Sequence, residues 1–237
     1  KEKLVGLDDY IRKLKDDIFS VSRELVIIPI VGMGGIGKTT LARAVFDYPS
    51  VARRFDIRRW LTISQNCNLR ATLLSLLDDK AHYDAMDLVD LSVEVHKMLK
   101  KRRYLIAVDD IWSLNAWDDI KRSLPDDLNG SRILLTTRDY EVANYAISSN
   151  AICNLEFMDM ESSWRLLEQR VFGDEGCCPV ELVDIGKTIA EGCRGLPLAI
   201  IVIAGILSHI GQTPNAWESI ANDVSGALIT DDEQFTE

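Results

Sequence analysis

The sequence predicts an α/β protein: a parallel five-stranded sheet flanked by helices and followed by a small all-α bundle. Three observations lead to this prediction. Up to about residue 156, apolar segments of strand length alternate with segments of helical periodicity. A glycine-rich motif stands between the first such strand and the helix after it. Beyond about residue 157 the helical periodicity continues without further strands. Strand–helix alternation of this kind is typical of a parallel sheet.

The expected strands are continuous apolar runs rather than alternating patterns, as is typical of strands covered on both faces. They are Leu25–Val31, Arg59–Ile63, Tyr104–Val108, Arg132–Thr136 and Ile152–Leu155. The helices expected between them are Thr39–Asp47, Asn68–Asp79, Asp87–Lys101, Asn115–Arg122 and Tyr140–Ala146, with Asn68, Asp87 and Asn115 as N-caps.

Helices are also expected at both ends of the chain. The first twenty residues form an amphipathic pattern with Leu7, Ile11, Leu14 and Ile18 on one face. Four helical segments follow the sheet, at Ser162–Phe172, Val180–Cys193, Leu196–Ile210 and Asn215–Val224. We therefore expect an N-terminal linker and helix over residues 1–22, a first domain over 23–156 and a helical domain over 157–237. The acidic residues 231–233 are expected to be a solvated linker.

The longest apolar run, Leu196–Leu207, is too short to cross a bilayer, which takes about 20 residues. We expect a helix buried within the protein and no transmembrane segment. The 27 Lys and Arg against 37 Asp and Glu give a net charge of −10, so no overall positive field would attract nucleic acid. The five cysteines, Cys67, Cys153, Cys177, Cys178 and Cys193, include no C-x-x-C pair. This usage is typical of reduced thiols in a cytoplasmic protein.

The glycine-rich motif Gly32–Thr39 (GMGGIGKT) fits the phosphate-binding pattern G-x-x-x-x-G-K-[ST]. In such a loop, backbone N–H groups and the N-terminus of the next helix bind phosphate oxygens. Lys38 would contact the β- and γ-phosphates, and Thr39 would ligate Mg²⁺. The residues expected to contact the nucleotide are Gly32, Gly34, Gly35, Ile36, Gly37, Lys38, Thr39 and Thr40, with Thr40 at the α-phosphate.

Two carboxylates follow the buried strand Leu105–Val108. Ligands bind at the carboxyl ends of the strands in open α/β sheets. We expect Asp109 to hold Mg²⁺ through water, and Asp110 to orient or deprotonate an attacking water, with Lys38 as the second catalytic residue. The basic run at residues 100–103 (KKRR) leaves three interpretations open: a cap on a helix C-terminus that also keeps a loop soluble, a nuclear signal, or an anion-binding patch.

A third strand ends in Thr136, Thr137 and Arg138, and an arginine at this edge would sense the γ-phosphate. The three histidines lie in no H-E-x-x-H or Cys/His arrangement, and no G-x-S-x-G is present. The guanine-reading pattern Asn-Lys-x-Asp is also absent from the sequence, so adenine is the expected base.

These motifs together resemble the NB-ARC domain of plant intracellular immune receptors. The resemblance rests on Gly32–Thr40 (GMGGIGKTT), Leu105–Trp112 (LIAVDDIW), Gly130–Arg138 (GSRILLTTR) and Gly195–Leu198 (GLPL), with weaker support from residues 55–64 and 155–172. It covers nearly the whole chain. Trp112 after the aspartate pair resembles the coiled-coil class of these receptors.

The resemblance implies a STAND-type P-loop ATPase that acts as a switch: ADP-bound when off, exchanging to ATP to drive self-assembly and defence signalling up to hypersensitive cell death. It implies that Val5 lines the adenine pocket, that Pro197 packs on the adenine, and that residues 157–237 correspond to the ARC1 part of the family. It also implies a preceding coiled coil and following leucine-rich repeats in the full chain, and other immune receptors or pathogen effectors as partners.

Two functions therefore stay open from the sequence. The first is a slow ADP/ATP switch with weak ATPase activity and bound Mg²⁺. The second is a turnover enzyme, a P-loop ATPase or small-molecule kinase, with the helical half as a lid over the substrate. The nucleotide retained by purified protein distinguishes them.

Overall fold

The computed structural model describes residues 4–63, 68–147, 152–173 and 176–233, with side chains of the last helix described as far as Val224. The chain divides into two compact units. The first, here called the sheet unit, contains Asp9–Gly34 and Lys38–Leu155. The second, the helical unit, contains Lys1–Asp8, Gly35–Gly37 and Glu156–Glu237.

The sheet has five strands in the order β2-β3-β4-β1-β5, and neighbouring strands run parallel. The strands are β1 (Val26–Val31), β2 (Ile57–Thr62), β3 (Tyr104–Ile111), β4 (Arg132–Thr137) and β5 (Cys153–Asn154). The predicted five-stranded parallel sheet is therefore confirmed. Every residue of β1 and β4 is buried, as their continuous apolar runs indicated.

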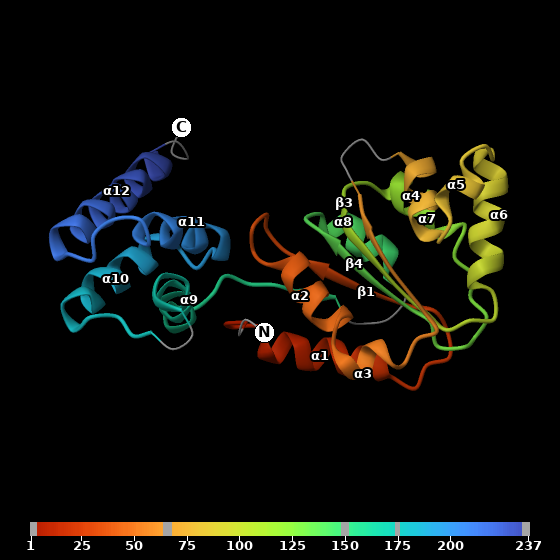
Figure 1. The fold of residues 1–237 in the computed structure, drawn as a ribbon, viewed down its shortest axis with the longest axis horizontal. Helices are drawn as coiled ribbons and strands as arrows, with labels where there is room; N and C mark the ends of the chain where they lie inside the picture. The colour runs from red at the N-terminus through yellow and green to blue at the C-terminus, as the bar shows by residue number, and fades with distance from the viewer. Residues whose placement is uncertain (1–3, 64–67, 148–151, 174–175, 234–237) are drawn as a thin grey trace. The chain divides into compact units, whose positions relative to one another are not determined.

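Helices cover both faces of this sheet (Figure 1). On one side lie α1 (Asp8–Phe19), α2 (Lys38–Phe46) and the short α3 (Pro49–Ala52). The other face carries α4 (Leu69–Leu76), α5 (Lys80–Tyr83), α6 (Leu88–Leu99), α7 (Leu114–Lys121) and α8 (Tyr140–Ala146). A continuous apolar core joins the sheet to the helices of this second face, with Leu73, Leu91, Trp117 and Val142 among its buried side chains.

Local capping decides where several of these helices begin. Asn68 and Asp87 cap α4 and α6 as predicted, each accepting a backbone N–H. The prediction for α7 was wrong: Ser113, not Asn115, is its N-cap and accepts the N–H of Ala116. The helix expected over residues 68–79 ends at Leu76, because Asp79 caps a separate turn of helix, α5.

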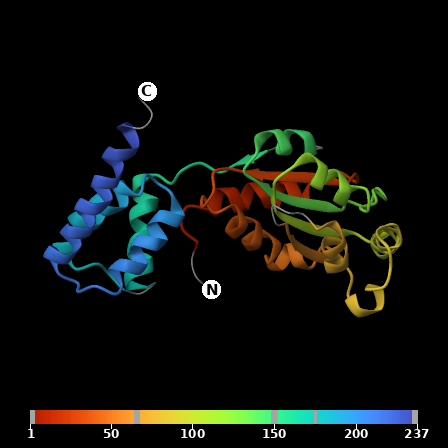
Figure 2. The same ribbon diagram turned by 90° about the horizontal axis from the view of Figure 1, so that it is seen from above.

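The helical unit contains α9 (Met160–Phe172), α10 (Val180–Gly192), α11 (Pro197–Leu207) and α12 (Pro214–Glu233). Figure 2 shows these four helices from a second direction. They enclose their own apolar core, in which the rings of Phe172 and Trp217 stack with centroids 6.0 Å apart. The helix α12 continues through Glu233, so the linker expected at residues 231–233 is helical instead.

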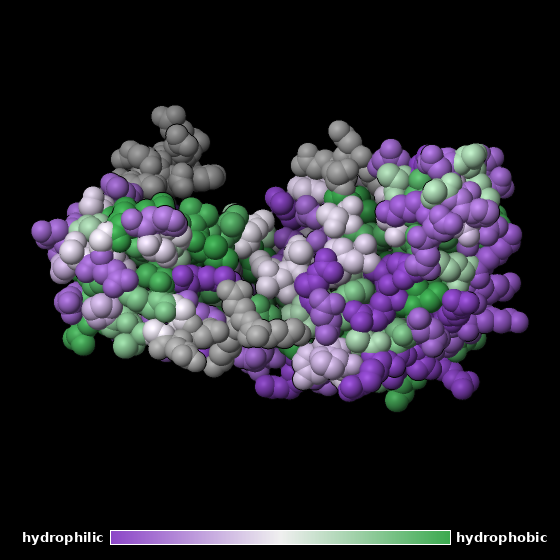
Figure 3. Space-filling view, in the orientation of Figure 1, coloured by the Kyte–Doolittle hydropathy of each residue, from purple (hydrophilic) through white to green (hydrophobic). Residues whose placement is uncertain are grey.

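Helix α11 is covered on only one of its faces. Ile200, Ala204 and Leu207 are buried, but an apolar stripe made of Leu198, Ile201, Val202 and Ile206 is exposed. The expectation of a fully buried helix was therefore wrong for this stripe. Hydrophobic surface is visible on the helical unit in Figure 3. Among the described helices, none is both long enough and apolar enough to cross a membrane.

Candidate functional site

The loop between β1 and α2 has the backbone of a phosphate-binding turn. Gly35 and Gly37 adopt φ angles of 77° and 103°, in the region that favours glycine because a side chain would clash with the backbone. Ile36 between them is buried. The loop leads directly into Lys38, the first residue of α2, so the helix N-terminus follows the turn.

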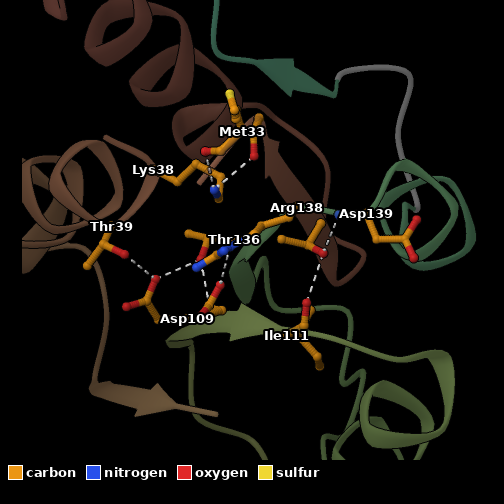
Figure 4. Close-up of polar contacts among 11 residues, drawn as sticks. Met33, Lys38, Thr39, Asp109, Ile111, Thr136, Arg138 and Asp139 are labelled. Carbon is orange, nitrogen blue, oxygen red and sulfur yellow. Dashed lines mark hydrogen bonds and ion pairs between the residues drawn. The ribbon is translucent and has the colours of Figure 1, made fainter. Parts of the chain in front are cut away.

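Lys38 extends back along this loop and is only 7% exposed. Its Nζ donates hydrogen bonds to the carbonyl oxygens of Gly32 and Met33, both at 2.9 Å (Figure 4). Burial lowers the pKa of the ammonium group and Arg138 lowers it further, whereas Asp110 and Asp109 act in the opposite direction. The ammonium is thus held at the loop by backbone carbonyls, with both carboxylates near enough to influence it.

Asp109 is the centre of a hydrogen-bond network at the carboxyl end of the sheet. Its Oδ1 accepts from the Thr39 hydroxyl at 2.9 Å and from the Thr136 hydroxyl at 2.7 Å. The Thr136 Oγ1 in turn accepts the N–H of Asp110 at 2.8 Å. The network joins α2, β3 and β4, and it leaves the buried carboxylate in one fixed orientation (Figure 4).

Asp110 directly follows Asp109 in the sequence, but its carboxylate interacts with a different residue, Arg138. The pairing of β3 with β4 shifts register between Val108 and Ile111, and Asp110 has a φ of 61°. In a regular strand, successive side chains would simply point to opposite faces. Here the Asp110 carboxylate lies 3.7 Å from the Arg138 Nε, while Asp109 stays with Thr39.

Arg138 lies against the phosphate loop. A Cβ atom added to Gly34 would come within 2.9 Å of the Arg138 Nη1, so the guanidinium lies directly against the loop backbone at Gly34. The Arg138 Cζ also lies 4.7 Å from the centroid of the Trp112 ring. The side chain remains half exposed and so has donors available for a ligand.

The sequence motifs include Thr136 and Trp112, but sequence reasoning assigns neither of them a contact of its own in the site. It places Thr136 at the end of the strand that carries the γ-phosphate sensor, and the contact with Asp109 becomes visible only when β3 and β4 are aligned. Thr137, the other hydroxyl of that motif, has a local role instead. Its Oγ1 donates to the Ile111 carbonyl and accepts the Asp139 N–H.

The remaining predicted contacts are distributed between the two units. Thr40 is exposed in the first turn of α2. Val5 packs in the apolar core of the helical unit, and Pro197 is the first residue of α11. The roles of Val5 and Pro197 toward an adenine stay predictions.

A divalent cation fits the oxygen atoms of this network. Within the described part of the chain, no group of three or more His, Cys, Asp and Glu side chains could hold a metal ion. Mg²⁺ does not need such a group, because it usually keeps several waters and takes one or two carboxylates with phosphate oxygens. Thr39 and Asp109 present a hydroxyl and a carboxylate 2.9 Å apart, which is compatible with Thr39 as a direct ligand of the ion and Asp109 as its partner through water.

Comparison with known proteins gives matches in sequence as well as structure. A model of the NB-ARC domain family matches residues 7–177. Two putative late blight resistance protein homologs of Solanum demissum, R1B-16 and R1B-23, are 41% and 40% identical to this chain, each over 97% of its length. The chain spans 18% of the length of each relative.

Solved structures share the fold at low sequence identity. A STAND protein with a tetratricopeptide repeat sensor from Pyrococcus horikoshii matches with a TM-score of 0.56 and 16% identity, over 93% of this chain and 33% of that one. The Drosophila ORC bound to DNA matches with a TM-score of 0.65 and 8% identity, over 97% of this chain and 62% of that one. At such identities the comparison concerns the fold alone.

Proposed function

We propose, starting from the fact that this chain belongs to the NB-ARC domain family, that it is an ADP- and ATP-binding switch of a plant disease-resistance receptor. The observation that carries the proposal is the network in which Thr39 and Thr136 hold the Asp109 carboxylate beside the phosphate loop. Next to the glycine turn and to Arg138, this network would complete a nucleotide site with groups for the phosphates and for a cation.

In this proposal each residue has a distinct task. The loop residues Gly32, Gly34, Gly35, Ile36 and Gly37 surround the phosphates, and Lys38 exchanges its carbonyl partners for phosphate oxygens. Thr39 and Asp109 would hold Mg²⁺, which when bound neutralises phosphate charge. Thr40 binds the α-phosphate, and Val5 and Pro197 line the adenine.

Asp110 and Arg138 give the site its sensitivity to the γ-phosphate. Arg138 adjoins Gly34 and is paired only loosely with Asp110, at 3.7 Å. An arginine in this position can form charge-assisted hydrogen bonds to γ-phosphate oxygens that ADP lacks. A ligand shifts a switch only through contacts that differ between its two states. Asp110 then orients the attacking water during slow hydrolysis.

The wider role belongs to the whole receptor. We propose that exchange of ADP for ATP drives self-assembly and defence signalling in the cytoplasm, with a coiled coil and leucine-rich repeats in the full chain. We also propose that the ARC1-like helical domain begins at residue 157. The late blight resistance homologs, of which this chain spans 18%, support this role.

The second candidate is a turnover ATPase or small-molecule kinase with the helical half as a lid. The exposed stripe of α11, made of Leu198, Ile201, Val202 and Ile206, carries no polar side chain that could itself orient a substrate. Small-molecule sites do need a few well-placed polar groups to orient the ligand.

The test is to denature the purified chain and to identify the released nucleotide by chromatography. A switch retains close to one ADP per chain, whereas an enzyme is isolated empty and turns over rapidly. The Lys38→Arg variant, with its broad guanidinium in place of a slim ammonium, should retain none. Lys13→Arg, an exposed lysine on α1, is the matched control. Rapid turnover without retained ADP would contradict the switch.

A further inference from the structure

Four arginines lie at the edge of the sheet opposite the phosphate loop. Arg23 precedes β1, Arg54 precedes β2, Arg103 precedes β3, and Arg132 is the first residue of β4. Because these strands are parallel and in register, with Val26 beside Arg132 and Ile57 beside Tyr104, their starting ends meet at one edge. In Figure 1 this is the end of β1 reached from α1, away from the loop that enters α2.

Three of the four arginines line a cavity with a volume of ≈ 570 Å³. Its walls include Arg23, Arg54, Arg103, Phe19, Asn129 and Gly130. Small-molecule sites generally measure about 300–1,000 Å³, so the cavity has the size of a ligand site. Gly130, in the wall of the cavity, also lies next to the fourth arginine, Arg132. A Cβ atom at Gly130 would lie 3.7 Å from the Arg103 Nε and 3.9 Å from the Arg132 Nη1.

The four arginines and the cavity lining contain three unpaired buried polar atoms, and all three are hydrogen-bond donors. The Arg54 Nε, the Arg132 Nε and the Asn129 Nδ2 are buried and have no hydrogen-bond partner among the described residues. Leaving a buried donor unpaired costs stability, and it costs more when the donor is charged. Arg54 and Asn129 line the cavity whereas Arg132 lies behind it, so a ligand that supplies only acceptors would offer partners to the donors of Arg54 and Asn129.

The charges point to the same kind of ligand. Burial, together with repulsion from Arg54 and Arg103, lowers the pKa of Arg132 to about 10. Burial and Arg103 likewise lower the pKa of Arg54. Among the ion pairs of the described residues, none joins these four arginines to an Asp or Glu. The Asp56 carboxylate does contact this region, but it accepts the backbone N–H of Arg103 and not its guanidinium.

A purely structural role explains the positions of Arg132 and Arg103 but not those of the other two arginines. Arg132 is fully buried and donates to the carbonyl oxygens of Ser20, Ser22 and Glu24, so it fixes the segment between α1 and β1. Arg103 donates to the Asn129 carbonyl at 2.7 Å. Neither task requires the exposed Arg23 or the unpaired Nε of Arg54.

We propose that this cavity binds a small anion that carries more than one phosphate group. The net charge of −10 opposes a long polyanion such as nucleic acid, whereas a small anion responds to the local arginines. Arginine is suited to this task because its planar fork binds phosphate oxygens in pairs. The site is separate from the phosphate loop and does not depend on the proposed switch.

The test uses the whole chain and inorganic tripolyphosphate as the probe, with binding measured by calorimetry. All proteins carry Lys38→Ala, which removes the phosphate-loop cation, so that binding there does not mask the second site. We expect saturable binding near one per chain, weakened at least about tenfold by Arg23→Ala or Arg54→Ala, the loss expected for one charged hydrogen bond. Arg102→Ala, an exposed neighbour of Arg103 outside the cavity lining, should bind within about twofold of the parent.

Several outcomes would overturn the site. They are no saturable binding, equal weakening by Arg102→Ala, or tighter binding of a short DNA duplex than of tripolyphosphate. Circular dichroism checks that each variant is folded. With Lys38 intact, Arg23→Ala should leave ADP retention unchanged, which separates this site from the switch. Vesicles containing a phosphoinositide distinguish the two sources of the phosphate groups. If the protein sediments with the vesicles and this requires Arg23 and Arg54, the ligand is a lipid headgroup. If the protein does not sediment with them, the ligand is a free anion.

Discussion

Thr136 and Arg138 stand two residues apart at the end of β4 and act on different parts of the site. Thr136 is fully buried and fixes Asp109, whereas Arg138 is half exposed and faces the phosphate loop. The sequence identified the strand end and its arginine. It could not assign the threonine, because the contact that decides its role comes from a residue 27 positions earlier on another strand.

Replacing Thr136 with valine tests its contact with Asp109. The variant keeps the side-chain shape but removes a donor to the carboxylate and an acceptor for the Asp110 N–H. We expect ADP affinity in Mg²⁺ to fall about fivefold to a hundredfold, the range for losing a buried hydrogen-bond partner at about 1–3 kcal/mol. Titration with and without Mg²⁺ measures this, and Thr136→Ser should restore most of the loss. Equal affinity in Thr136→Val would show that Asp109 needs no such support.

Replacing Arg138 with alanine tests the discrimination between the two nucleotides. The charged hydrogen bonds to a γ-phosphate are available only with ATP, so we expect ATP affinity to fall about tenfold to a hundredfold and ADP affinity to change little. Both nucleotides are titrated into nucleotide-free protein, with Arg165→Ala, an exposed arginine of α9, as control. If ADP and ATP weaken equally, Arg138 supports the fold and senses nothing.

At the scale of the helix, Gly186 is one of the glycines that allow close packing in the helical unit. A Cβ atom at Gly186 of α10 would lie 2.4 Å from Trp164 and 3.0 Å from Trp217. Gly205 of α11 has no atom within 4 Å of the same position. These two glycines form a matched pair, because each lies inside a helix and differs from the other in its surroundings.

We expect Gly186→Ala to lower the free energy of unfolding by about 1–3 kcal/mol through overpacking. Gly205→Ala should raise it by about 0.5–1 kcal/mol, because alanine loses less backbone entropy than glycine in a helix. Urea unfolding followed by circular dichroism measures both variants. A gain in stability from Gly186→Ala would mean that the two tryptophans can move aside.

Sequence patterns predicted most elements and missed several boundaries for identifiable reasons. Ser113 and Asn115 both have a side chain that can act as an N-cap. Ser113 is the N-cap because β3 extends to Ile111 and α7 begins at Leu114, directly after Ser113. That extension of β3 includes two aspartates, which no apolar pattern could mark as strand. Periodicity also could not show the exposed stripe of α11, because residues are apolar on all its sides.

For the molecule as a whole, the reactivity of the cysteine thiols tests whether both apolar cores are buried. Burial raises the pKa of Cys153 and of Cys193 from 9.0 to about 11, whereas Cys177 is exposed. Cys67 lies outside the described residues. Since the thiolate is the reactive form, buried thiols with a raised pKa should be inert near neutral pH.

We expect iodoacetamide at about pH 8, just below the ordinary pKa of a thiol, to modify Cys177 in the folded chain and to leave Cys153 and Cys193 unmodified until urea is added. Peptide mass spectrometry locates the label. Because the raised pKa means that the folded state binds these protons more tightly, the stability they contribute is present below pH 9 and is lost between about pH 9 and 11. Labelling of Cys153 as fast as Cys177 would contradict the buried position.

The place of β1 in the sheet has a consequence for synthesis on the ribosome. Its sheet partners are β4 and β5, so its nearest partner in the chain begins at Arg132, about 100 residues later. At about 5–20 residues per second, the apolar strand Val26–Val31 waits about 5–20 s before β4 exists. During that interval β2 and β3 can already pair, whereas β1 is an aggregation-prone segment. A nascent chain of this protein therefore has a defined window, closing when residue 137 emerges, in which a chaperone would have to cover its first strand.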